Sequence, residues 1–539
     1  MNRIIAIIIT LFLLCFDSTI VAQKSKYEVR AVWLTTIGGL DWPHRYARSS
    51  TSIEAQKQEL IQILDKLQEA GINTVLLQTR IRGTVIYPSR YEPWDGCMSG
   101  IPGRSPGYDP LQFAISECHK RGMELQAWVV TIPIGKWNGL GIKNLKNQRV
   151  TTLKKIGADG YMSPEDARTG EYLSRICSEI VENYDVDGIH LDYIRYPETW
   201  NIKIPKDRAR QYITDIVSRI HDAVKSRKPW VKLSCSPVGK ADDLTRYYSY
   251  DWNAYNKVCQ DAQGWLRDGL MDELFPMMYF RGNQFYPFAI DWSEQASGRI
   301  IVSGLGIYFM SPAEKNWDSS VIEREMHMLR SYKLGYAFFR SKFFTDNLKD
   351  IYDFTAKFNR HPALVPPMTW ASKQTPPAPQ NLRLEKQILK WEKADDTYYN
   401  IYSSSTWPID IQNGDNLLAA KIATDYLEIE DTNMYYAVTA MDRYGIESRP
   451  STIRQVSPKQ DINVSLPCDG RKVTIPALYL QDSPNLTVAI TSLTGVILST
   501  ATVRTNNVDV HQLANGSYIL RTLSANGQSH RIGYFTINR

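Results

Sequence analysis

The most informative stretch of the chain reads Val186-Asp187-Gly188-Ile189-His190-Leu191-Asp192-Tyr193-Ile194-Arg195-Tyr196-Pro197. Side chains alternate across a β-strand, so Ile189 and Leu191 share one apolar face, whereas His190 and Asp192 share the other. Asp192 then falls at the end of a short buried strand. A carboxylate in that position is typical of catalytic residues in barrels of parallel strands, although a surface aspartate that caps the next helix has the same local pattern.

Outward from this stretch, apolar strand-like runs alternate with amphipathic helical runs. The expected strands are Val29–Thr35, Thr74–Gln78, Leu125–Val130, Gly188–Asp192, Val231–Ser236, Leu274–Tyr279, Ile300–Gly304 and Tyr336–Phe339. The clearest helical patterns are Ile53–Ala70, Pro110–Arg121, Thr169–Tyr184 and Asp207–Lys225. Eight strands alternating with helices predict an α/β fold of the (β/α)₈ TIM barrel type. An open doubly wound sheet is the alternative, and it is disfavoured because no glycine-rich phosphate loop follows the first strand.

The character of the sequence changes beyond the barrel, which we place at residues 24–361. Residues 362–379 are rich in proline and end in Thr375-Pro376-Pro377-Ala378-Pro379, a pattern typical of a linker. Short alternating strands with turns follow, and they predict two β-sandwich domains at residues 380–457 and 458–539.

Both sandwich regions contain segments with family-like patterns. Tyr435–Ser448, near the end of the first, resembles the last hairpin of a fibronectin type III domain. In the second, Thr491–Gly495, Asn515–Arg521 and Gly533–Ile537 resemble the C-terminal sorting-type sandwich of secreted proteins. A generic β-sandwich spacer is the equal alternative for the second domain.

The N-terminus has the pattern of an export signal. Arg3 precedes a near-continuous apolar run from Ile4 to Phe16, and small and polar residues lead to Ala22. The run is too short to span a membrane as a mature helix, so we expect a signal peptide at residues 1–23 and a secreted, periplasmic or cell-surface protein without a membrane-spanning segment. A lipoprotein interpretation of Cys15 is weaker, because bulky Leu14 occupies a position where a small residue is needed.

Charge and cysteine content exclude several classes of function. The net charge is +6, spread over 63 basic and 57 acidic residues without a basic run, so no nucleic-acid-binding surface is expected. The six cysteines after the signal peptide show neither Cys-x-x-Cys spacing nor a zinc-site pattern. We therefore expect mostly free buried thiols, no metal and no cofactor. His190 with Asp192 is a pair that suggests a metal ligand set, but no second histidine motif supports it.

The barrel segments together resemble the glycosyl-hydrolase-like family 10 proteins. The matching segments lie in the expected order: Glu28–Leu34, Leu40–Pro43, Ile72–Arg80, Tyr87–Ser89, Glu92–Trp94, Gly107–Leu111, Ala127-Trp128, the stretch around Asp192, Trp265–Asp272 and Pro276–Tyr279. The resemblance implies a TIM barrel that acts on bacterial or complex glycans. Gln126 stands before Ala127 where many relatives have histidine, and His190-Leu191 replaces an arrangement that often carries another aspartate. The exact substrate of the relatives therefore cannot be assigned to this protein.

Cleavage of a glycosidic bond typically requires one carboxylic acid to protonate the leaving oxygen and one carboxylate to act as nucleophile or base. Asp192 is the best-supported catalytic candidate, as the charged carboxylate that stabilises or attacks the anomeric carbon, which would leave the acid role to the second carboxyl group. Asp41 is the candidate for the second, because it lies just past the first strand beside Trp42; a loop-capping aspartate is the alternative. Asp272 and Glu273 precede the apolar run of the sixth strand, so we expect them at the opposite, N-terminal end of the barrel.

Polar and aromatic side chains near the strand ends are candidates for sugar binding. Aromatic rings pack on the C–H faces of sugars, whereas amides and charges bind the hydroxyl groups. The candidates are Trp33, Trp42, Gln78, Arg80, Trp94, Gln126, Trp128, His190, Tyr193, Arg195 and Tyr279. For any single tryptophan, packing between barrel and helices is the alternative.

The sequence therefore predicts an exported glycoside hydrolase whose substrate is an oligo- or polysaccharide, from a bacterial cell wall or a complex glycan. The alternative function is a catalytically silent, glycan-binding barrel that serves in capture or adhesion, because a barrel that loses one carboxylate keeps its aromatic cleft. A second carboxylate near Asp192 would distinguish the two functions, and its separation would indicate retention or inversion at the anomeric carbon.

Overall fold

A computed structural model describes residues 25–385, 387–429, 434–454, 465–476, 478–481, 485–493, 496–523 and 529–539. The predicted signal peptide at residues 1–23 lies outside these ranges. The chain forms two compact units: the first holds the residues up to Glu428 and Tyr435–Ile453, and the second holds Ile429–Met434 and Arg454–Arg539. Within the described ranges, no helix is both long and apolar enough to cross a membrane.

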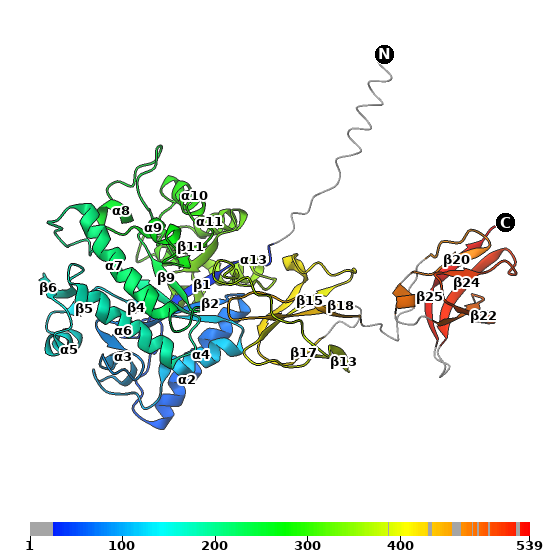
Figure 1. Ribbon diagram of the computed structural model, residues 1–539, viewed down its shortest axis with the longest axis horizontal. Helices are drawn as coiled ribbons and strands as arrows, with labels where there is room; N and C mark the ends of the chain where they lie inside the picture. The colour runs from blue at the N-terminus through cyan, green and yellow to red at the C-terminus, as the bar shows by residue number, and fades with distance from the viewer. Residues whose placement is uncertain are drawn as a thin grey trace, which may run out of the picture. The chain divides into compact units, whose positions relative to one another are not determined.

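Eight parallel strands form a closed barrel in the first unit (Figure 1). In order around the ring they are β1 (Arg30–Leu34), β2 (Thr74–Ile81), β4 (Glu124–Val130), β8 (Gly188–Asp192), β9 (Lys232–Ser236), β10 (Glu273–Leu274), β11 (Ile300–Leu305) and β12 (Gly335–Phe338). β1 pairs with both β2 and β12, which closes the ring. The predicted TIM barrel is therefore confirmed. β10 is shorter than expected because Pro276 has no N–H to donate, and pairing resumes only as isolated bridges at Met277.

Helices pack around the barrel strands (Figure 1). They are α2 (Ser50–Glu69), α3 (Gly96–Ser99), α4 (Pro110–Lys120), α6 (Ala167–Asn183), α7 (Lys206–Lys225), α8 (Ala254–Lys257), α9 (Ala262–Arg267), α10 (Tyr286–Glu294), α11 (Ser319–Ser331), α12 (Ser341–Thr345) and α13 (Ile351–Phe358). Short 3₁₀ turns lie at η1 (Ile37–Gly39), η2 (Gly282–Gln284), η3 (Ile307–Met310) and η4 (Leu348–Asp350). All four predicted helices are present. Two of them begin at side-chain caps: Ser49 accepts from the Ser52 N–H, and Asp109 accepts from the Gln112 N–H.

The loops that follow β2 and β4 carry extra structure. β3 (Thr84–Val85) pairs antiparallel with the end of β2. After β4, a small antiparallel sheet contains β5 (Pro133–Lys136), β7 (Asp159–Met162) and β6 (Leu153–Ile156), with α5 (Leu140–Gln148) between β5 and β6. Both insertions lie at the C-terminal end of the barrel strands, which is the end where barrel enzymes place their active sites.

Alternate residues of the barrel strands face two separate cores. Ile189 and Leu191 of β8 pack into the outer core between strands and helices. His190 contacts the inner cluster that fills the barrel axis. Members of that inner cluster include Ala31, Trp33, Leu76, Trp128, Phe275, Val302 and Ala337. The two faces predicted for the strand at residues 188–192 are therefore confirmed.

Residues 362–379, the predicted linker, run along the N-terminal end of the barrel. Leu364 exchanges backbone hydrogen bonds with Lys26 and Glu28. Trp370 donates its indole N–H to Asp272 at 2.9 Å and packs, with Val365, on the inner cluster of the barrel. This segment therefore covers the base of the barrel.

The first β-sandwich contains two antiparallel sheets, with the 3₁₀ turn η5 (Gly414–Asn416) beside them. One sheet contains β13 (Arg383–Glu385), β14 (Ile388–Lys390) and β17 (Tyr426–Glu428). The other contains β16 (Leu417–Ile422), β15 (Tyr398–Ser404), β18 (Tyr435–Met441) and β19 (Ser451–Arg454). A sandwich after the barrel was predicted; its resemblance to fibronectin type III domains stays a prediction.

Charged side chains fasten this sandwich to the base of the barrel. Lys421 of β16 places its Nζ 2.7 Å from Asp187 and 3.7 Å from Glu124. Lys26 forms a second pair with Glu447, at 2.6 Å. All five side chains are nearly or fully buried. Glu124 also pairs with Lys232 at 2.7 Å and Asp187 with His119 at 2.8 Å, so Lys421 joins the sandwich to a buried charge cluster of the barrel. Both lysines therefore tie the sandwich to the barrel through buried ion pairs.

The second unit is also built from β-strands. It contains a pair, β20 (Lys472–Thr474) and β23 (Asn507–Asp509), and a sheet of β22 (Ile497–Val503), β21 (Leu486–Thr491), β24 (Gly516–Leu523) and β25 (Ser529–Ile537), with α14 (Leu478–Gln481). Its own apolar core includes Val473, Val488, Leu520 and Phe535. This agrees with the predicted second sandwich, and its sorting-type identity stays a prediction.

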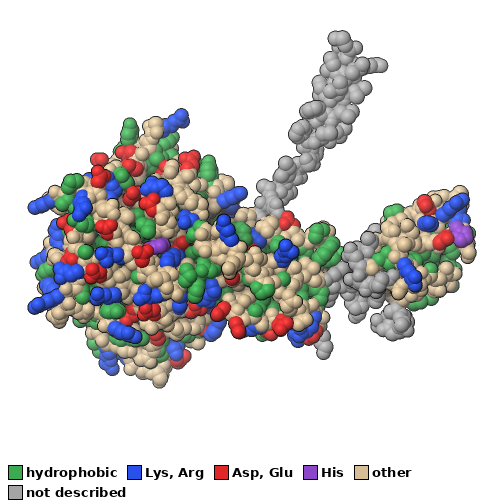
Figure 2. Space-filling model, in the orientation of Figure 1, with side chains coloured by type: hydrophobic (Ala, Val, Ile, Leu, Met, Phe, Trp, Pro, Cys, Tyr) green, Lys and Arg blue, Asp and Glu red, His purple; other side chains and the backbone are tan. Residues whose placement is uncertain are grey.

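The distribution of charged side chains and the state of the cysteines agree with what the composition predicted. On the face shown in Figure 2, Lys and Arg side chains are interspersed with Asp and Glu. The six cysteines among the described residues are free, and all but Cys468 are buried. The expectation of mostly free buried thiols is therefore confirmed.

Candidate active site

Asp192 lies at the C-terminal end of β8, between Val130 of β4 and Ser236 of β9 in the strand register. Its carboxylate accepts hydrogen bonds from the Ser236 hydroxyl at 2.9 Å, the Trp128 indole N–H at 3.1 Å and the Tyr193 backbone N–H at 2.8 Å. The side chain is buried in this mouth of the barrel. The position predicted for Asp192, at the end of a barrel strand, is the one the structure shows.

Two opposing effects set the pKa of Asp192. Burial raises it, while the hydrogen bonds from Ser236 and Trp128 and the positive charge of Arg195 lower it; the net result is a pKa above the ordinary aspartate value. A carboxyl group with a raised pKa keeps its proton to higher pH. That is the property a general acid requires when it protonates a leaving group.

The two residues that follow Asp192 in the predicted site lie beside it. Tyr193 adopts a left-handed backbone with φ of 53°, a conformation that costs a non-glycine residue about 1–3 kcal/mol and clusters at functional sites. The guanidinium carbon of Arg195 lies 4.4 Å from the centre of the Tyr193 ring. Arg195 also pairs with Glu198 at 2.9 Å. Arg195 therefore braces Tyr193 and contributes positive potential near Asp192.

Aromatic rings line the same end of the barrel interior. Trp33 makes edge contacts with Phe275 and Phe339, both with ring centres 6.0 Å away. Tyr279 lies 5.5 Å from Phe339 and 5.8 Å from Tyr308. Burial raises the pKa of Tyr279, and its neighbours Tyr308 and Asp192 raise it further, so this tyrosine stays protonated. Phe275, Phe339 and Tyr308 were not predicted, although the first two fall within expected strands.

His190 lies one layer below the mouth and does not face it. Its Nε2 accepts from the Trp33 indole N–H at 3.3 Å, and its Nδ1 lies 2.9 Å from the Ser234 hydroxyl. Burial lowers the pKa of His190 to about 3, so the ring is neutral. Because both nitrogens have partners inside the barrel, His190 orients Trp33, and its predicted role in binding substrate is corrected.

Gln126 and Glu273 continue this polar chain toward the base of the barrel. Ser234 donates to Gln126 at 2.6 Å, and Gln126 donates to Glu273 at 2.5 Å. Burial raises the pKa of Glu273 to about 7. Gln126, predicted to bind substrate, thus lies in the interior, and Glu273 is separated from the mouth by the Gln126–Ser234 layer.

The Asp41 carboxylate does not form a catalytic pair with Asp192. Its Oδ2 accepts from the Thr35 N–H at 2.8 Å and the Thr35 hydroxyl at 2.9 Å. Its Oδ1 accepts from the Lys342 N–H at 3.0 Å and pairs with Arg340. The buried carboxylate therefore ties the loop after β1 to the loop after β12. The prediction of Asp41 as the second catalytic carboxylate is corrected to a structural role, because each oxygen already accepts two hydrogen bonds.

The side chains of Trp42 and Arg80 are also engaged by other residues of the barrel. The Trp42 ring is fully buried, and its indole N–H donates to the Gln56 carbonyl at 2.9 Å. Arg80 is buried in a two-pronged pair with Glu92, at 2.7 and 2.6 Å, and donates to the Thr131 carbonyl. Neither side chain is open to a ligand, because packing and internal charge pairing occupy both.

Gln78 and Trp94 form contacts that position loops near the end of β2. The Gln78 side-chain oxygen accepts from the backbone N–H groups of Thr36 and Ile37, which fixes the loop after β1. Trp94 is half-buried, and its backbone bridges to Val85 of β3. Of the predicted site, the structure thus brings together Trp33, Trp128, Asp192, Tyr193, Arg195 and Tyr279.

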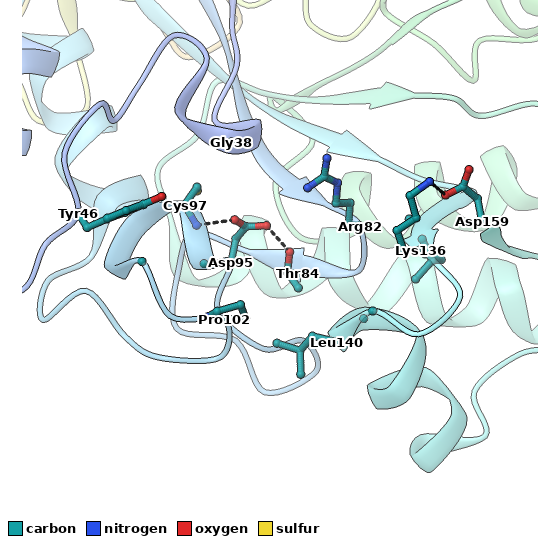
Figure 3. Close-up of a pocket in the computed structure, with 16 residues that line it drawn as sticks. Gly38, Tyr46, Arg82, Thr84, Asp95, Cys97, Pro102, Lys136, Leu140 and Asp159 are labelled. Atoms are coloured by element: carbon teal, nitrogen blue, oxygen red, sulfur yellow. Dashed lines mark hydrogen bonds and ion pairs between the residues drawn. The ribbon is translucent and has the colours of Figure 1, made fainter.

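A cavity of about 770 Å³ opens among the loops after β2 and β4 (Figure 3). Its lining includes Tyr46, Arg82, Thr84, Asp95, Lys136 and Asp159 together with several glycines. None of the residues predicted for the site lines it. Sequence reasoning missed it because its walls come from loops far apart in the chain.

No group of three or more His, Cys, Asp or Glu side chains suited to a metal ion occurs in the described part of the chain. The mouth of the barrel holds the buried carboxyl group of Asp192 with aromatic and hydrogen-bonding neighbours.

Comparison with known proteins places this geometry in a family context. A model of the family described as Glycosyl hydrolase-like 10 matches residues 28–209 and 201–323. The chain is 27% identical to Glycosyl hydrolase YngK of Bacillus subtilis (strain 168) over 503 residues, which cover 83% of this chain and 97% of that protein. It is 29% identical to Glycosyl hydrolase DigH of Escherichia coli (strain K12) over 293 residues, 48% of this chain and 67% of that protein. Among solved structures, the catalytic domain of a Paenibacillus polymyxa β-amylase aligns with a TM-score of 0.43 and 10% identity, over 63% of this chain and 99% of that one.

Proposed function

This chain belongs to the glycosyl hydrolase-like 10 family, and from that premise we propose that it is a glycoside hydrolase in which Asp192 is the catalytic acid. The observation that carries the assignment is the position of Asp192: a buried carboxyl group with a raised pKa, at the C-terminal mouth of a TIM barrel. Trp128, Tyr193 and Tyr279 surround it and provide surfaces for a sugar ring.

The proposed step is protonation of the glycosidic oxygen. Protonated Asp192 donates to that oxygen while the bond to the anomeric carbon breaks, and positive charge develops on the sugar ring. Water then adds to the anomeric carbon and gives its surplus proton to bulk solvent, from which Asp192 regains a proton. The negative charge left on Asp192 is stabilised by the donors already in place, Ser236, Trp128 and the Tyr193 N–H.

The substrate class and the site of action extend the proposal. We also infer export, since residues 1–23 have the pattern of a signal peptide, and a cell-wall or complex polysaccharide as the substrate. N-terminal sequencing of the mature protein tests export: the expected first residue follows Ala22 or Gln23. An intact N-terminus in the culture's soluble cell fraction would contradict it.

The experiment for the activity is a digest of purified glycans by the native protein. Peptidoglycan with and without stem peptides, plant polysaccharides and host glycans are incubated with the protein, and new reducing ends are counted. Asp192→Asn should release none on the substrate that the native protein cleaves. Release by the native protein and Asp192→Asn alike would contradict the role of Asp192.

One observation favours a second candidate function, a glycan-binding barrel without turnover. Asp41, the carboxylate predicted to act with Asp192, accepts hydrogen bonds from Thr35, Arg340 and Lys342 and so is held in a structural network. Binding of a glycan by the native protein at micromolar concentration, with no new reducing ends after prolonged incubation, would support this candidate and reject the hydrolase.

A further inference from the structure

The cavity beside the barrel mouth has the size of a ligand site. Its volume, about 770 Å³, lies within the roughly 300–1,000 Å³ typical of small-molecule pockets. Arg82 lies in it between two polar pairs, Asp95 with Thr84 and Lys136 with Asp159 (Figure 3).

Arg82 occupies an unusual backbone position. It is the first of two central residues in the tight turn between β2 and β3, with φ of 59°, and Gly83 follows with φ of 67°. Turns of this kind favour Asn, Asp or Gly at the first position, because a left-handed backbone is costly for other residues. An arginine here carries a conformational cost that its side chain can offset only through a function or a contact.

Neighbouring backbone is shaped around the Arg82 side chain. A methyl group on Gly135 would come within 2.9 Å of the Arg82 Cγ, and one on Gly141 within 2.0 Å of the Arg82 carbonyl oxygen. Gly135 therefore packs against the stem of the Arg82 side chain, and Gly141 packs against the Arg82 backbone. The guanidinium group lies at the end of a supported stem, as a binding residue requires.

The charge of Arg82 is not neutralised by its surroundings. Of the two acidic residues in the lining, Asp159 pairs with Lys136 at 2.9 Å, and Asp95 accepts from Thr84 at 2.6 Å and from the Cys97 N–H at 2.8 Å. Within the described residues, no Asp or Glu forms an ion pair with Arg82. Its exposed guanidinium is available for a planar, two-pronged bond to a carboxylate.

An exposed aromatic ring forms another part of the cavity wall. Tyr46 is 51% exposed, and the guanidinium carbon of Arg48 lies 5.1 Å from its ring centre. Both side chains lie against Gly100, where a Cβ would meet Arg48 at 2.7 Å and Tyr46 at 2.8 Å. An aromatic face beside cationic groups suits a sugar that bears a negative charge.

The cavity lies close to Asp192. Thr131 donates its hydroxyl to the Asp192 carbonyl at 2.8 Å, and Ile134, three residues later, lines the cavity. Three residues of extended chain span at most about 11 Å. An oligosaccharide of a few units is long enough to span that distance.

From these observations we propose that the cavity is a subsite for a carboxylate-bearing sugar unit of the glycan, in which Arg82 binds the carboxylate and the Tyr46 ring packs against the sugar. The proposal rests on the proposed glycan function and adds the class of sugar. It applies equally to a uronic acid and to a sugar with an acidic ether substituent, because Arg82 recognises the carboxylate in either.

Binding of monosaccharides tests the subsite without any dependence on turnover, because these ligands have no glycosidic bond to cleave. Saturation-transfer NMR titrations of the full chain compare D-glucuronate with D-glucose, and N-acetylmuramate with N-acetylglucosamine. We expect the native protein to bind at least one acid about tenfold more tightly than its neutral counterpart. The acid that binds identifies the source of the carboxylate.

Variants test whether Arg82 causes the preference for the acidic sugar. Arg82→Ala should abolish the preference for the acid, and Arg82→Lys should retain part of it. Arg267→Ala, which removes an exposed arginine paired with Asp268 outside the cavity lining, should leave it unchanged. Tyr46→Ala should weaken acid and neutral sugar alike. No preference in the native protein, or a preference that survives Arg82→Ala, would overturn the proposal. A preference present without any glycan hydrolysis would instead reject only the hydrolase activity.

Discussion

The Trp128 indole N–H donates to the Asp192 carboxylate at 3.1 Å across neighbouring strands of the barrel. This bond stabilises the charged form of Asp192 and so lowers its pKa against the rise caused by burial. The protonation state of the candidate acid is therefore set by residues of both adjacent strands, β4 and β9, and changes in these donors should be visible in pH profiles.

Trp128→Phe should raise the pKa of Asp192 further. Loss of a hydrogen bond to the carboxylate disfavours the charged form, so the loss of kcat/KM at high pH should move upward by about one pH unit. The measurement is the pH dependence of kcat/KM on the substrate identified by glycan digestion. Ser236→Ala, which removes another donor, should shift the profile in the same direction; a downward shift in both would contradict the acid role.

Asp192→Asn should lower kcat/KM at least about 100-fold, equivalent to roughly 2.7 kcal/mol of transition-state stabilisation. The loss should be smaller on aryl glycosides with good leaving groups, which need little protonation. Steady-state kinetics on both substrate types check this, with circular dichroism to confirm folding. An equal loss on both types would show that Asp192 is not the proton donor.

Asp41→Asn is the matched control with the opposite outcome. The substitution weakens the bond to Arg340 and places an amide N–H₂ where a hydrogen-bond acceptor is needed. We expect a loss of about 2 kcal/mol in the free energy of unfolding, with kcat/KM near the native value below the unfolding temperature. A large loss of kcat/KM in a fully folded Asp41→Asn protein would restore Asp41 as a catalytic residue.

Lys421→Met should destabilise the first unit by about 3 kcal/mol, because Asp187 would keep only His119 and Glu124 only Lys232 as a partner. Thermal unfolding should show the barrel and first sandwich melting at a lower temperature. Lys390→Met, which removes a half-buried lysine of the same sandwich that pairs only with the exposed Glu385, should change the melting temperature little. Equal effects from the two variants would contradict the fastening role of Lys421.

Glu273 should make stability depend on pH. Its pKa rises from 4.5 in the unfolded chain to about 7 in the folded one, so between these values the folded protein holds a proton that the unfolded chain has lost. The free energy of unfolding should therefore fall as pH rises from 4.5 to 7, by a few kcal/mol, and level off above it. Chemical denaturation of the native protein and Glu273→Gln across this range checks the prediction; identical slopes would reject it.

Local patterns in the sequence were enough for the barrel and for Asp192. Alternating apolar runs specify strands with two buried faces, and helix signals such as Ser49 and Asp109 lie next to the helices that they cap. The end of the fourth barrel strand is readable from residues 186–197 alone, so the position of Asp192 at the mouth followed from periodicity and the (β/α)₈ order.

Only the tertiary structure decided which neighbours each candidate side chain meets. Asp41 and Asp192 look alike in sequence, since both follow a strand. Arg340, about 300 residues from Asp41 in the chain, pairs with the Asp41 carboxylate. The Asp192 carboxylate instead accepts hydrogen bonds from the uncharged Ser236 and Trp128 side chains and remains a buried acid. Partners so distant along the chain have no signature within a local window. The cavity around Arg82 was invisible for the same physical reason: its walls meet only when the loops after β2 and β4 fold against each other.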